Sequence, residues 1–506
     1  ITCTNMDFLC VQFHSTIKHI IFIIRRYKYI LVFSYVGGMC MKKLLNWIVP
    51  AAFGLGLWFI PTPEGLTPQS WHLFAIFVAT IVGFITQPLP IGGVSIVVIT
   101  VAALTGTLKI GEAISGFANS AIWLIVGAFL FSRGFIKTGL GKRIAYNLIA
   151  AFGSSSLRLA YALALSDLIL APATPSNTAR VGGVIMPITT SLAKAFGSEP
   201  QDGPRKIGSF LMQSIYQVNT ITSAMFQTSM AGNTLVAALA LQSFGIGITW
   251  GDWAMAAIVP GIIALLIMPY FIYKVYPPEI TDAREAQQMI REELKGLGKM
   301  SFQEWVMLGV FVLALVLWAT SQFTKLDATT VAFLGISILL ATSVLVWDDV
   351  KSEKGAWDTL VWMGTLMGFA GFLSKLGFIK WATVQVGGVI PEGSWVIAFV
   401  IAVLVNTYAH YVFASLTAHI SAMFVAFSAI AISAGAPPML TLLMIAFTSN
   451  LCMSLTHYAA GPSPVIFNTG YVPQNTWWKL GFFASVINLI IFMGLGSVWM
   501  KLIGMW

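Results

Sequence analysis

Apolar segments of about 20 residues, the length a helix needs to cross a lipid bilayer, recur along the whole chain. None of them shows the alternation of apolar and polar residues that is typical of a membrane β-barrel strand. Hydrophobic residues make up 57% of the 506 residues and charged residues 9%, which is more apolar surface than a soluble domain can bury. The sequence therefore predicts a polytopic, all-α membrane protein.

Hydropathy divides the chain into single spans and two longer apolar stretches. We expect about 11 transmembrane helices, at residues 46–60, 71–86, 92–108, 119–137, 208–243, 252–274, 303–321, 328–347, 358–376, 440–470 and 478–502. The stretches 158–194 and 396–434 carry polar residues at their middle, which does not suit a single span. Each is predicted to be a re-entrant helical hairpin, which enters the membrane and turns back.

The only strongly charged stretch of the sequence lies near its centre, in residues 277–302. It contains R-E-A-Q-Q-M-I-R-E-E-L-K, a pattern that indicates an amphipathic helix, and we expect a cytoplasmic linker helix there. The linker divides the chain into residues 41–276, which hold a first helix and a first repeat, and residues 303–506, which hold a second repeat.

Two matching motifs indicate that repeat. The motif V-G-A-F-L-F-S-R-G-F matches M-G-T-L-M-G-F-A-G-F, so that Gly127 aligns with Gly364 at an offset of 237 (364 − 127). Further along, S-N-T-A-R matches S-L-T-A-H, so that Ser176 aligns with Ser415 at an offset of 239 (415 − 176). The spans give each part an odd number of crossings, so the second copy is predicted to be inverted. Inverted repeats are typical of secondary transporters, whose binding sites lie near the bilayer midplane.

The segment A-P-A-T-P-S-N-T-A-R lies in the middle of the first hairpin. Pro172 and Pro175 remove two backbone donors and disfavour a continuous helix, so the chain is predicted to turn close to Ser176. At such a tip, free N–H groups and small polar side chains bind an anion. Helix capping or hydrogen bonding between helices is the alternative role for these side chains. The candidate substrate-binding residues of the two tips are Ser176, Asn177, Thr178, Ser415 and Thr417.

Two later segments place small polar residues and glycine inside long apolar runs. They are T-S-M-A-G-N-T (228–234) and T-H-Y-A-A-G-P-S-P (456–464). Both are predicted to interrupt their helices, and broken helices beside two hairpins favour a site for a small anion with charge at both ends. The candidate site residues of these segments are Gly232, Asn233, Gly461, Pro462 and Ser463.

Arg180 follows the first tip, and His419 takes the equivalent position after the second. A cation at membrane depth costs at least about 2.5–3.5 kcal/mol unless it is paired or solvated. We therefore expect Arg180 and His419 to compensate the charge of a bound anion, so that Arg180→Ala abolishes transport with folding intact. Asp167, which aligns with Asn406, is a partner for Arg180, a proton carrier or a residue of a helix end.

Basic residues point to the orientation of the chain. The net charge of +9 comes from Lys and Arg residues scattered among short loops, which does not favour a nucleic-acid-binding face. When loops alternate sides, the side that holds Lys42 and Lys43 carries about three times as many basic residues as the other. This asymmetry predicts a cytoplasmic N-terminus and an outer C-terminus, in a bacterial-type inner membrane.

Residues 1–40 differ from the rest of the chain. They begin at Ile1 and hold three of the four cysteines, and Met41 after them is followed by K-K-L-L-N-W. We interpret them as a non-native or upstream extension, with a signal-anchor helix as the alternative. Only Cys452 lies in the apolar body, so neither a disulfide framework nor a metal site is predicted. His410, Tyr411, His457 and Tyr458 lack acidic partners and are not expected to bind a metal.

On the motifs P-S-N-T-A-R and F-A-S-L-T-A-H, the chain from residue 41 to residue 506 resembles the divalent anion:sodium symporter family, the INDY-type carriers. Within it the chain is similar to the branch of 2-oxoglutarate/malate and citrate/succinate exchangers. The resemblance implies a homodimer, with a fixed scaffold and a moving transport part in an elevator-type carrier. It also implies that Ser176, Asn177 and Thr178 hold a substrate carboxylate and help to form a sodium site.

Leu416 departs from this family pattern, in which sodium-coupled members have an asparagine. Sodium is a hard cation that needs oxygen ligands, so the second sodium site is not expected, and a residual site is expected only at Ser176 and Asn177. The resulting hypothesis is a sodium-independent exchanger of C4 and C5 dicarboxylates such as 2-oxoglutarate, succinate and malate. A sodium-coupled dicarboxylate or citrate symporter and an anion channel are the alternatives. No phosphate loop, H-E-x-x-H or Rossmann motif indicates an enzyme, and no cofactor is expected.

Overall fold

The computed structural model describes residues 44–387 and 395–506, so the extension predicted for residues 1–40 lies outside the described residues. In this part of the chain the regular structure is helical, and the only β-type pairing is an isolated bridge between Ser155 and Asp282. Nine of the described helices are long and apolar enough to cross a membrane, by length and composition. Three shorter apolar helices span Leu44–Trp58, Ile91–Leu104 and Ala328–Ala341. The all-helical membrane fold is confirmed.

The first half of the chain contains a helical hairpin followed by a broken helix. Its helices are α2 (Pro68–Thr86), α3 (Ile91–Leu104), α4 (Ile110–Ala113), α5 (Ser120–Thr138), α6 (Leu140–Phe152), α7 (Ser156–Leu170), α8 (Asn177–Arg180), α9 (Met186–Ala195), α10 (Gly208–Met225), α11 (Ala231–Phe244) and α12 (Trp250–Val275).

The second half repeats this order. Its helices are α14 (Phe302–Ala319), α15 (Ser321–Thr324), α16 (Ala328–Ala341), α17 (Trp347–Ser352), α18 (Lys354–Lys375), α19 (Phe378–Gly387), α20 (Trp395–Ala409), α21 (Leu416–Ser433), α22 (Pro438–Leu451), α23 (Pro462–Phe467), α24 (Gln474–Leu489) and α25 (Ser497–Leu502). A short 3₁₀ turn lies before each hairpin tip, at Ala171–Ala173 and at His410–Val412, again at an offset of 239 (410 − 171).

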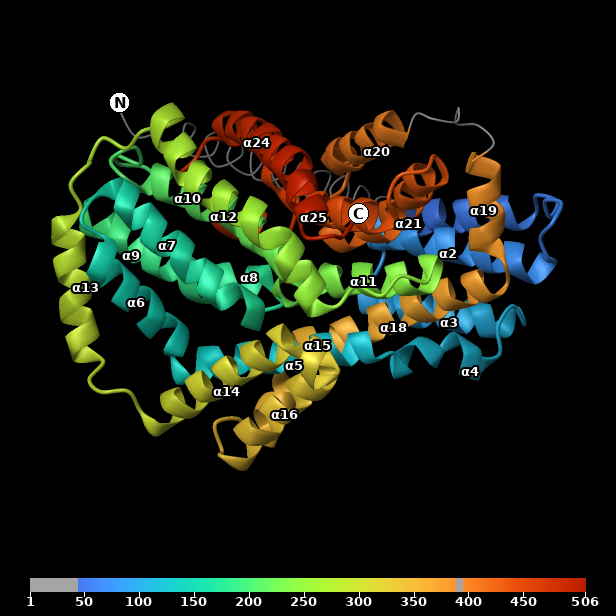
Figure 1. Ribbon diagram of the computed structural model, residues 1–506, viewed down its shortest axis with the longest axis horizontal. Coiled ribbons are helices and arrows are strands. Elements are labelled where there is room, and N and C mark those ends of the chain that lie inside the picture. Colours follow the sequence, from blue (N-terminus) through green and yellow to red (C-terminus); the bar gives the residue numbers. More distant parts are fainter. Residues whose placement is uncertain (1–43, 388–394) are drawn as a thin grey trace, which may run out of the picture.

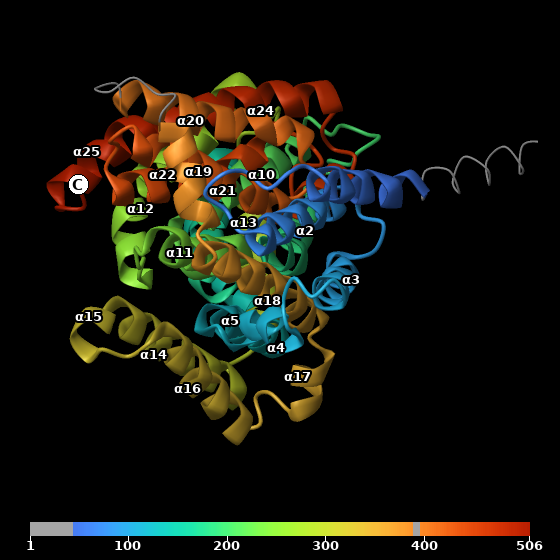
Figure 2. The ribbon, with the colours of Figure 1, turned by 90° about the vertical axis from the view of Figure 1, so that its right-hand side faces the viewer.

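The helices form two groups with α5 and α18 between them. Figures 1 and 2 show α14 to α16 on one side and α10, α12 and α24 on the other, and α5 and α18 occupy the middle in both views. The close approach of α18 to the 3₁₀ turn Ser115–Ala118 depends on glycine, because a Cβ on Gly116 would overlap the carbonyl of Gly364. Small residues at such crossings allow backbones to pack closely in membranes.

The linker between the halves holds helix α13 (Arg284–Gly296), which lies at the left edge of Figure 1 and packs on α6. Arg143 of α6 joins the end of this linker to the start of α14. Its Nε donates to Glu304 Oε1 at 2.5 Å and its Nη1 donates to the carbonyl of Gly298 at 2.9 Å. Ser301 caps α14 by accepting from the Glu304 N–H at 3.2 Å, so the helix start and the ion pair stabilise the same segment.

Each hairpin turns just after a 3₁₀ segment, and the first tip also contains two prolines. A serine caps the start of the second arm in both hairpins. In the first hairpin α7 ends at Leu170, Pro172 and Pro175 follow, and Ser176 is the N-cap of α8. From Asn177 the chain stays helical through a π-helical turn, Val181–Ile185, into α9. In the second hairpin α20 and α21 flank the tip, with Ser415 as the N-cap of α21.

Two stretches that the sequence counted among the spans, 208–243 and 440–470, are each broken. The first is interrupted between α10 and α11 by a 3₁₀ turn, Gln227–Ser229. The second is interrupted between α22 and α23 by a 3₁₀ turn, Cys452–Leu455, and an irregular segment. Glycine and proline near these breaks account for them, as the motifs there predicted, because such residues weaken or remove helical hydrogen bonds.

Candidate functional site

A pocket of about 300 Å³ lies between the tips of the two hairpins and the two broken helices. Both tips contribute polar side chains, while the starts of α11 and α23 contribute backbone and small residues. The lining residues are Gln87, Phe129, Pro175, Ser176, Asn177, Thr178, Met230, Ala231, Ala414, Ser415, Leu416, Thr417, Ala460 and Gly461. The matching segments of the two halves therefore face each other across one cavity.

The two serines cap their helices in the same way. Ser176 Oγ accepts from the Ala179 N–H at 3.1 Å, and Ser415 Oγ accepts from the Ala418 N–H at 3.3 Å. The N–H groups at the very start of a helix have no intrahelical acceptor, and the helix dipole adds positive potential there. Two such helix starts at one pocket provide donors for an anion with a negative charge at each end.

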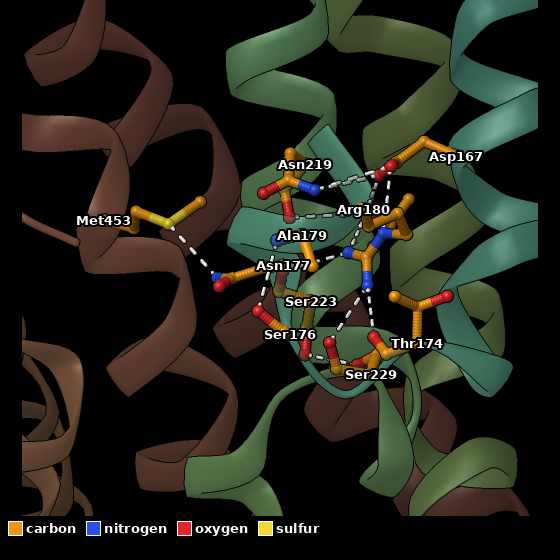
Figure 3. Close-up of polar contacts among 11 residues, drawn as sticks. Asp167, Thr174, Ser176, Asn177, Ala179, Arg180, Asn219, Ser223, Ser229 and Met453 are labelled. Carbon is orange, nitrogen blue, oxygen red and sulfur yellow. Dashed lines mark hydrogen bonds and ion pairs between the residues drawn. The ribbon is translucent and has the colours of Figure 1, made fainter. Parts of the chain in front are cut away.

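Asn177 and Thr178 connect the first tip to the second broken helix. Asn177 Nδ2 lies 3.6 Å from Met453 Sδ, and Figure 3 shows this side chain directed away from the guanidinium of Arg180. Thr178 lies against Gly461, where a Cβ would overlap Thr178 Oγ1. A glycine is thus required at residue 461 for the tip and the broken helix to meet as they do.

Leu416 lies in the pocket lining between Ser415 and Thr417, and only 5% of its surface is exposed. Its isobutyl group provides no oxygen for a cation at the second tip. Asn177 at the aligned position of the first tip provides an amide oxygen. The two tips are therefore chemically unequal, and oxygen ligands for a hard cation are richer at the first.

Arg180 lies behind the first tip and does not line the pocket. Its guanidinium donates five hydrogen bonds, which are drawn in part in Figure 3, to Asp167 Oδ1 (2.9 Å), the carbonyls of Thr174 (2.9 Å) and Ser229 (3.0 Å), Thr222 Oγ1 (3.2 Å) and Ser223 Oγ (3.2 Å). A guanidinium has five N–H donors, so each of them has an acceptor inside the protein. Of the roles left open for Asp167, the structure shows a partner of Arg180.

The paired arrangement changes the electrostatics expected at the first tip. Asp167 also accepts hydrogen bonds from the Thr222 hydroxyl and from Asn219 Nδ2, the latter at 3.2 Å. The positive charge of Arg180 is thus balanced by a carboxylate that is itself well bonded. In this arrangement Arg180 acts on a bound anion only from behind the tip, and its charge-compensating role stays a prediction.

His419 is also buried behind its tip and does not line the pocket. Neither ring nitrogen of His419 has a hydrogen-bond partner within the described residues. Its ring lies edge-on to that of His410, with centroids 4.9 Å apart. A buried polar group without a partner costs about 1–3 kcal/mol, so this histidine is chemically unusual.

The remaining candidate residues are in the broken helices. Asn233 Nδ2 donates to the carbonyls of Ser223 and Phe226 at 2.8 and 2.9 Å, and Asn233 Oδ1 accepts from Asn450 Nδ2 at 2.7 Å. Ser463 Oγ lies 2.8 Å from the hydroxyl of Tyr216. These contacts hold the breaks in place behind the pocket.

Six of the ten expected substrate-binding residues line the pocket and four do not. Ser176, Asn177, Thr178, Ser415, Thr417 and Gly461 are in the lining. Gly232, Asn233, Pro462 and Ser463 are buried around it.

Gln87 and Phe129 line the pocket and were not expected from the sequence. Gln87 ends α2 in the left-handed region, with φ 49° and ψ 58°, which is uncommon for a residue with a side chain. Pro88 and Pro90 signal the helix end, but no sequence pattern indicates that the side chain before them reaches a site formed by distant segments. Phe129 is indistinguishable from other aromatic residues of a transmembrane helix.

Another cavity, of about 220 Å³, lies between α2, α11, α18, α19 and α21. Its lining is almost wholly apolar, with side chains such as Phe74, Leu239 and Leu373. Its polar lining residues are two serines, Ser243 and Ser421, and it has no charged side chain in its lining, so the pocket between the two helix starts is the better candidate for an anion site.

An all-helical fold with many apolar spans, in which matching tips from two halves of the chain line one polar pocket, is typical of a multi-pass membrane transporter. The family model of the sodium:sulfate symporter transmembrane region matches residues 41–506. The chain therefore belongs to the divalent anion:sodium symporter family, as the two motifs predicted.

Three relatives support the same assignment. The putative malate transporter YflS of Bacillus subtilis is 51% identical over 471 residues, covering 93% of this chain and 98% of the relative. The chloroplastic dicarboxylate transporter 1 of Spinacia oleracea is 46% identical over 472 residues, which cover 93% of this chain and 82% of the relative. The inner membrane protein YbhI of Escherichia coli is 39% identical over 472 residues, which cover 92% of this chain and 98% of the relative.

Proposed function

We propose that this protein is a secondary transporter of C4 and C5 dicarboxylates such as malate, succinate and 2-oxoglutarate. The observation that carries the proposal is the pocket between two serine-capped helix starts, one from each half of the chain. A dicarboxylate has two anionic ends, and each tip offers N–H donors and hydroxyl groups to one of them. The names of the relatives YflS and dicarboxylate transporter 1 agree with this substrate class.

We propose further that transport is an exchange. The first N–H groups of a helix have no intrahelical acceptor, and a bound dianion supplies acceptors at both helix starts. An empty carrier would move these donors through a barrier without partners, and a penalty of about 3 kcal/mol slows that step about a hundredfold. Return with a second dianion avoids this penalty, so the preferred cycle exchanges one dicarboxylate for another.

Sodium independence is the next part of the proposal, and Leu416 supports it. A sodium ion needs several oxygen ligands, and the Leu416 side chain in the second tip has no oxygen atom to offer. The alternative, a sodium-coupled symporter, is favoured by one observation, the amide of Asn177 in the first tip. A residual sodium site at Ser176 and Asn177 belongs to that alternative.

We also propose an elevator-type movement in a homodimer, as the family resemblance implies. The moving part would contain the hairpins and the broken helices, whose segments form most of the pocket. Gln87 and Phe129 would belong to the scaffold, so the pocket would contact the scaffold through these two side chains. The proposed setting is a bacterial-type inner membrane, with the N-terminus cytoplasmic and the C-terminus outside.

Uptake into proteoliposomes tests these proposals together. Labelled malate, succinate and 2-oxoglutarate are offered to vesicles that are empty or preloaded with unlabelled dicarboxylate, with and without a sodium gradient. Uptake that needs preload and ignores sodium supports the exchanger. Sodium-driven uptake into empty vesicles would establish the symporter instead, and conductance far above carrier turnover would establish a channel.

A further inference from the structure

The two halves of the protein differ in how the residue after each tip is held. In the first half Arg180 bonds to the first hairpin arm through Asp167 and to the broken helix through Ser223 and Ser229. In the second half the side chain of the aligned His419 forms no hydrogen bond with any residue that the structure describes. A cation of the protein thus joins hairpin and broken helix in one half, and the other half lacks an equivalent.

Side chains that commonly bind metals surround His419. Each of His410, His419 and Cys452 offers one ligand atom, and these three atoms lie within 4.8 Å of one another. They come from the turn before the second tip, from the first helical turn after it and from the break of α22. All three residues have 0% exposed surface, so solvent does not compete for them.

The hydrogen bonds of the cluster suit metal binding. His410 Nε2 lies 2.9 Å from the carbonyl of Ala459, which can only accept, so Nε2 carries the proton. His410 Nδ1 then has a free lone pair, and it has no hydrogen-bond partner in the described part of the chain. A histidine that donates its other N–H to a carbonyl is the usual arrangement around a metal. The Cys452 thiol donates a hydrogen bond of 3.2 Å to the Ser449 carbonyl, and this bond is lost when the thiol becomes a thiolate.

We propose that His410, His419 and Cys452 bind one soft monovalent metal ion of the Cu(I) type. Thiolate and imidazole ligands favour such an ion over hard cations. Cys452 releases its thiol proton when the ion binds, and the one thiolate balances the one positive charge, so the loaded cluster is neutral, which lowers the cost of placing it at membrane depth. Arg180 and Asp167 form the corresponding neutral pair in the first half.

The bound ion has a structural consequence for the second hairpin. The ligands of the ion lie before the second tip, after it and at the break of α22. The ion therefore joins the hairpin to the broken helix, as Arg180 does in the first half. Metal removal should loosen the second tip while the first is unaffected. This inference is independent of which dicarboxylate the pocket binds and of whether transport is an exchange.

The test uses the full chain in lipid nanodiscs with Cys3, Cys10 and Cys40 replaced by serine, so that Cys452 is the only thiol. Ag(I) serves as a redox-inactive probe, and Cu(I) is titrated under anaerobic conditions. We expect one ion per chain, with thiolate-to-metal absorption, protection of Cys452 from alkylation, and one sulfur and two nitrogen neighbours in X-ray absorption. The chain has 21 methionines, whose thioether sulfurs can bind these ions weakly. Thiolate-to-metal absorption and protection of Cys452 report on the thiolate alone, so they distinguish the proposed site from thioether binding.

Variants decide whether the histidines are ligands. His419→Gln and His410→Gln should each weaken Ag(I) binding at least about tenfold, as even the loss of an outer partner does. His72→Gln is the matched control, since that ring stacks on Trp58 and is not part of the cluster, so binding should be unchanged. Equal affinity in the parent and in both glutamine variants would show a lone thiol and overturn the proposal. So would the absence of a retained ion, or a preference for Zn²⁺ over Cu(I).

Discussion

Arg180 Nε donates to Asp167 Oδ1 at 2.9 Å, and both side chains are shielded from solvent. Removing one partner of such a buried pair leaves an uncompensated charge, which costs about 3–5 kcal/mol. We therefore expect Arg180→Ala to lower the melting temperature and the yield of folded protein, whereas the sequence alone suggested a folded, inactive variant. Size-exclusion chromatography of heated samples measures this effect.

The double variant D167N/R180Q is the control for that prediction. It removes both charges and keeps side chains of similar length, so it should be more stable than either single variant. A double variant less stable than R180Q and D167N alone would mean that the two residues do not act as a pair.

Loss of a tip serine should affect transport more than stability. Ser176→Ala or Ser415→Ala removes an N-cap, which costs about 1 kcal/mol, and also a hydroxyl of the pocket. Uptake of labelled dicarboxylate should fall strongly. Ser155→Ala is the matched control, because Ser155 caps α7 outside the pocket. It should lower the melting temperature similarly with uptake unchanged, and an equal loss of uptake would contradict the assignment of the tips.

A methyl group at residue 461 should block transport. The Cβ of Gly461→Ala would overlap Thr178 Oγ1, which would separate the first tip from the second broken helix. We expect the uptake of labelled dicarboxylate into proteoliposomes to fall strongly. Gly309→Ala places the same methyl group on α14 where nothing lies within 4 Å, and this helix should tolerate it or gain stability. Full activity of Gly461→Ala would show that this contact is not needed.

Gln87 allows binding and backbone strain to be separated. Gln87→Gly removes the pocket amide and relieves the left-handed conformation at φ 49°, so stability should rise while KM increases. Loss of one hydrogen bond of about 0.5–1.5 kcal/mol corresponds to about a two- to tenfold change in KM. Gln87→Asn keeps an amide and tolerates this backbone, and its KM should change less. An unchanged KM in the glycine variant would remove Gln87 from the site.

The contact between α5 and α17 should depend on pH. Asp349 Oδ2 accepts from Lys137 Nζ at 2.5 Å. Partial burial raises the pKa of Asp349, but the bonds from Lys137 and the Val346 N–H hold the pKa below its ordinary value of 3.8. A carboxyl group with a lowered folded-state pKa stabilises the protein above its unfolded pKa, and this stabilisation is lost as the pH falls through the folded pKa.

The melting temperature of the wild type should therefore fall more steeply between about pH 5 and about pH 3 than that of Asp349→Asn. Asp348→Asn is the matched control, since Asp348 is largely exposed and pairs with Lys351, three residues further along the same helix. It should follow the wild-type curve. Identical curves for the wild type and Asp349→Asn would show that the ion pair contributes nothing.

Much of the fold could be predicted because the bilayer leaves few choices. Apolar length identified most helices, and prolines identified the break before Ser176, since both signals are local. The hairpins were expected at 158–194 and 396–434, and the helical segments of the structure that flank the two tips extend over 156–195 and 395–433. The breaks at 226–230 and 452–461 are less visible, because polar residues in an apolar run also occur in continuous helices.

The surroundings of the site could not be predicted, because they depend on which helices meet. Thr222 and Ser223 look like ordinary small polar residues of α10, yet they complete the bonds of Arg180. His410, His419 and Cys452 are separated by 9 and 33 positions, which is not the spacing of a metal motif. Helical periodicity indicates which face of a helix is buried, but not which other helix covers it.

The hydrogen bond between Asn233 and Asn450 joins the two broken helices, one from each half of the chain. Segments bonded in this way shift together, so the pocket should keep its shape while it changes its access. A dicarboxylate would then meet the same set of donors from either compartment. Substrate affinities measured from the two sides of the membrane should accordingly be equal, and for the exchange proposed above the net direction would follow from the concentrations on the two sides.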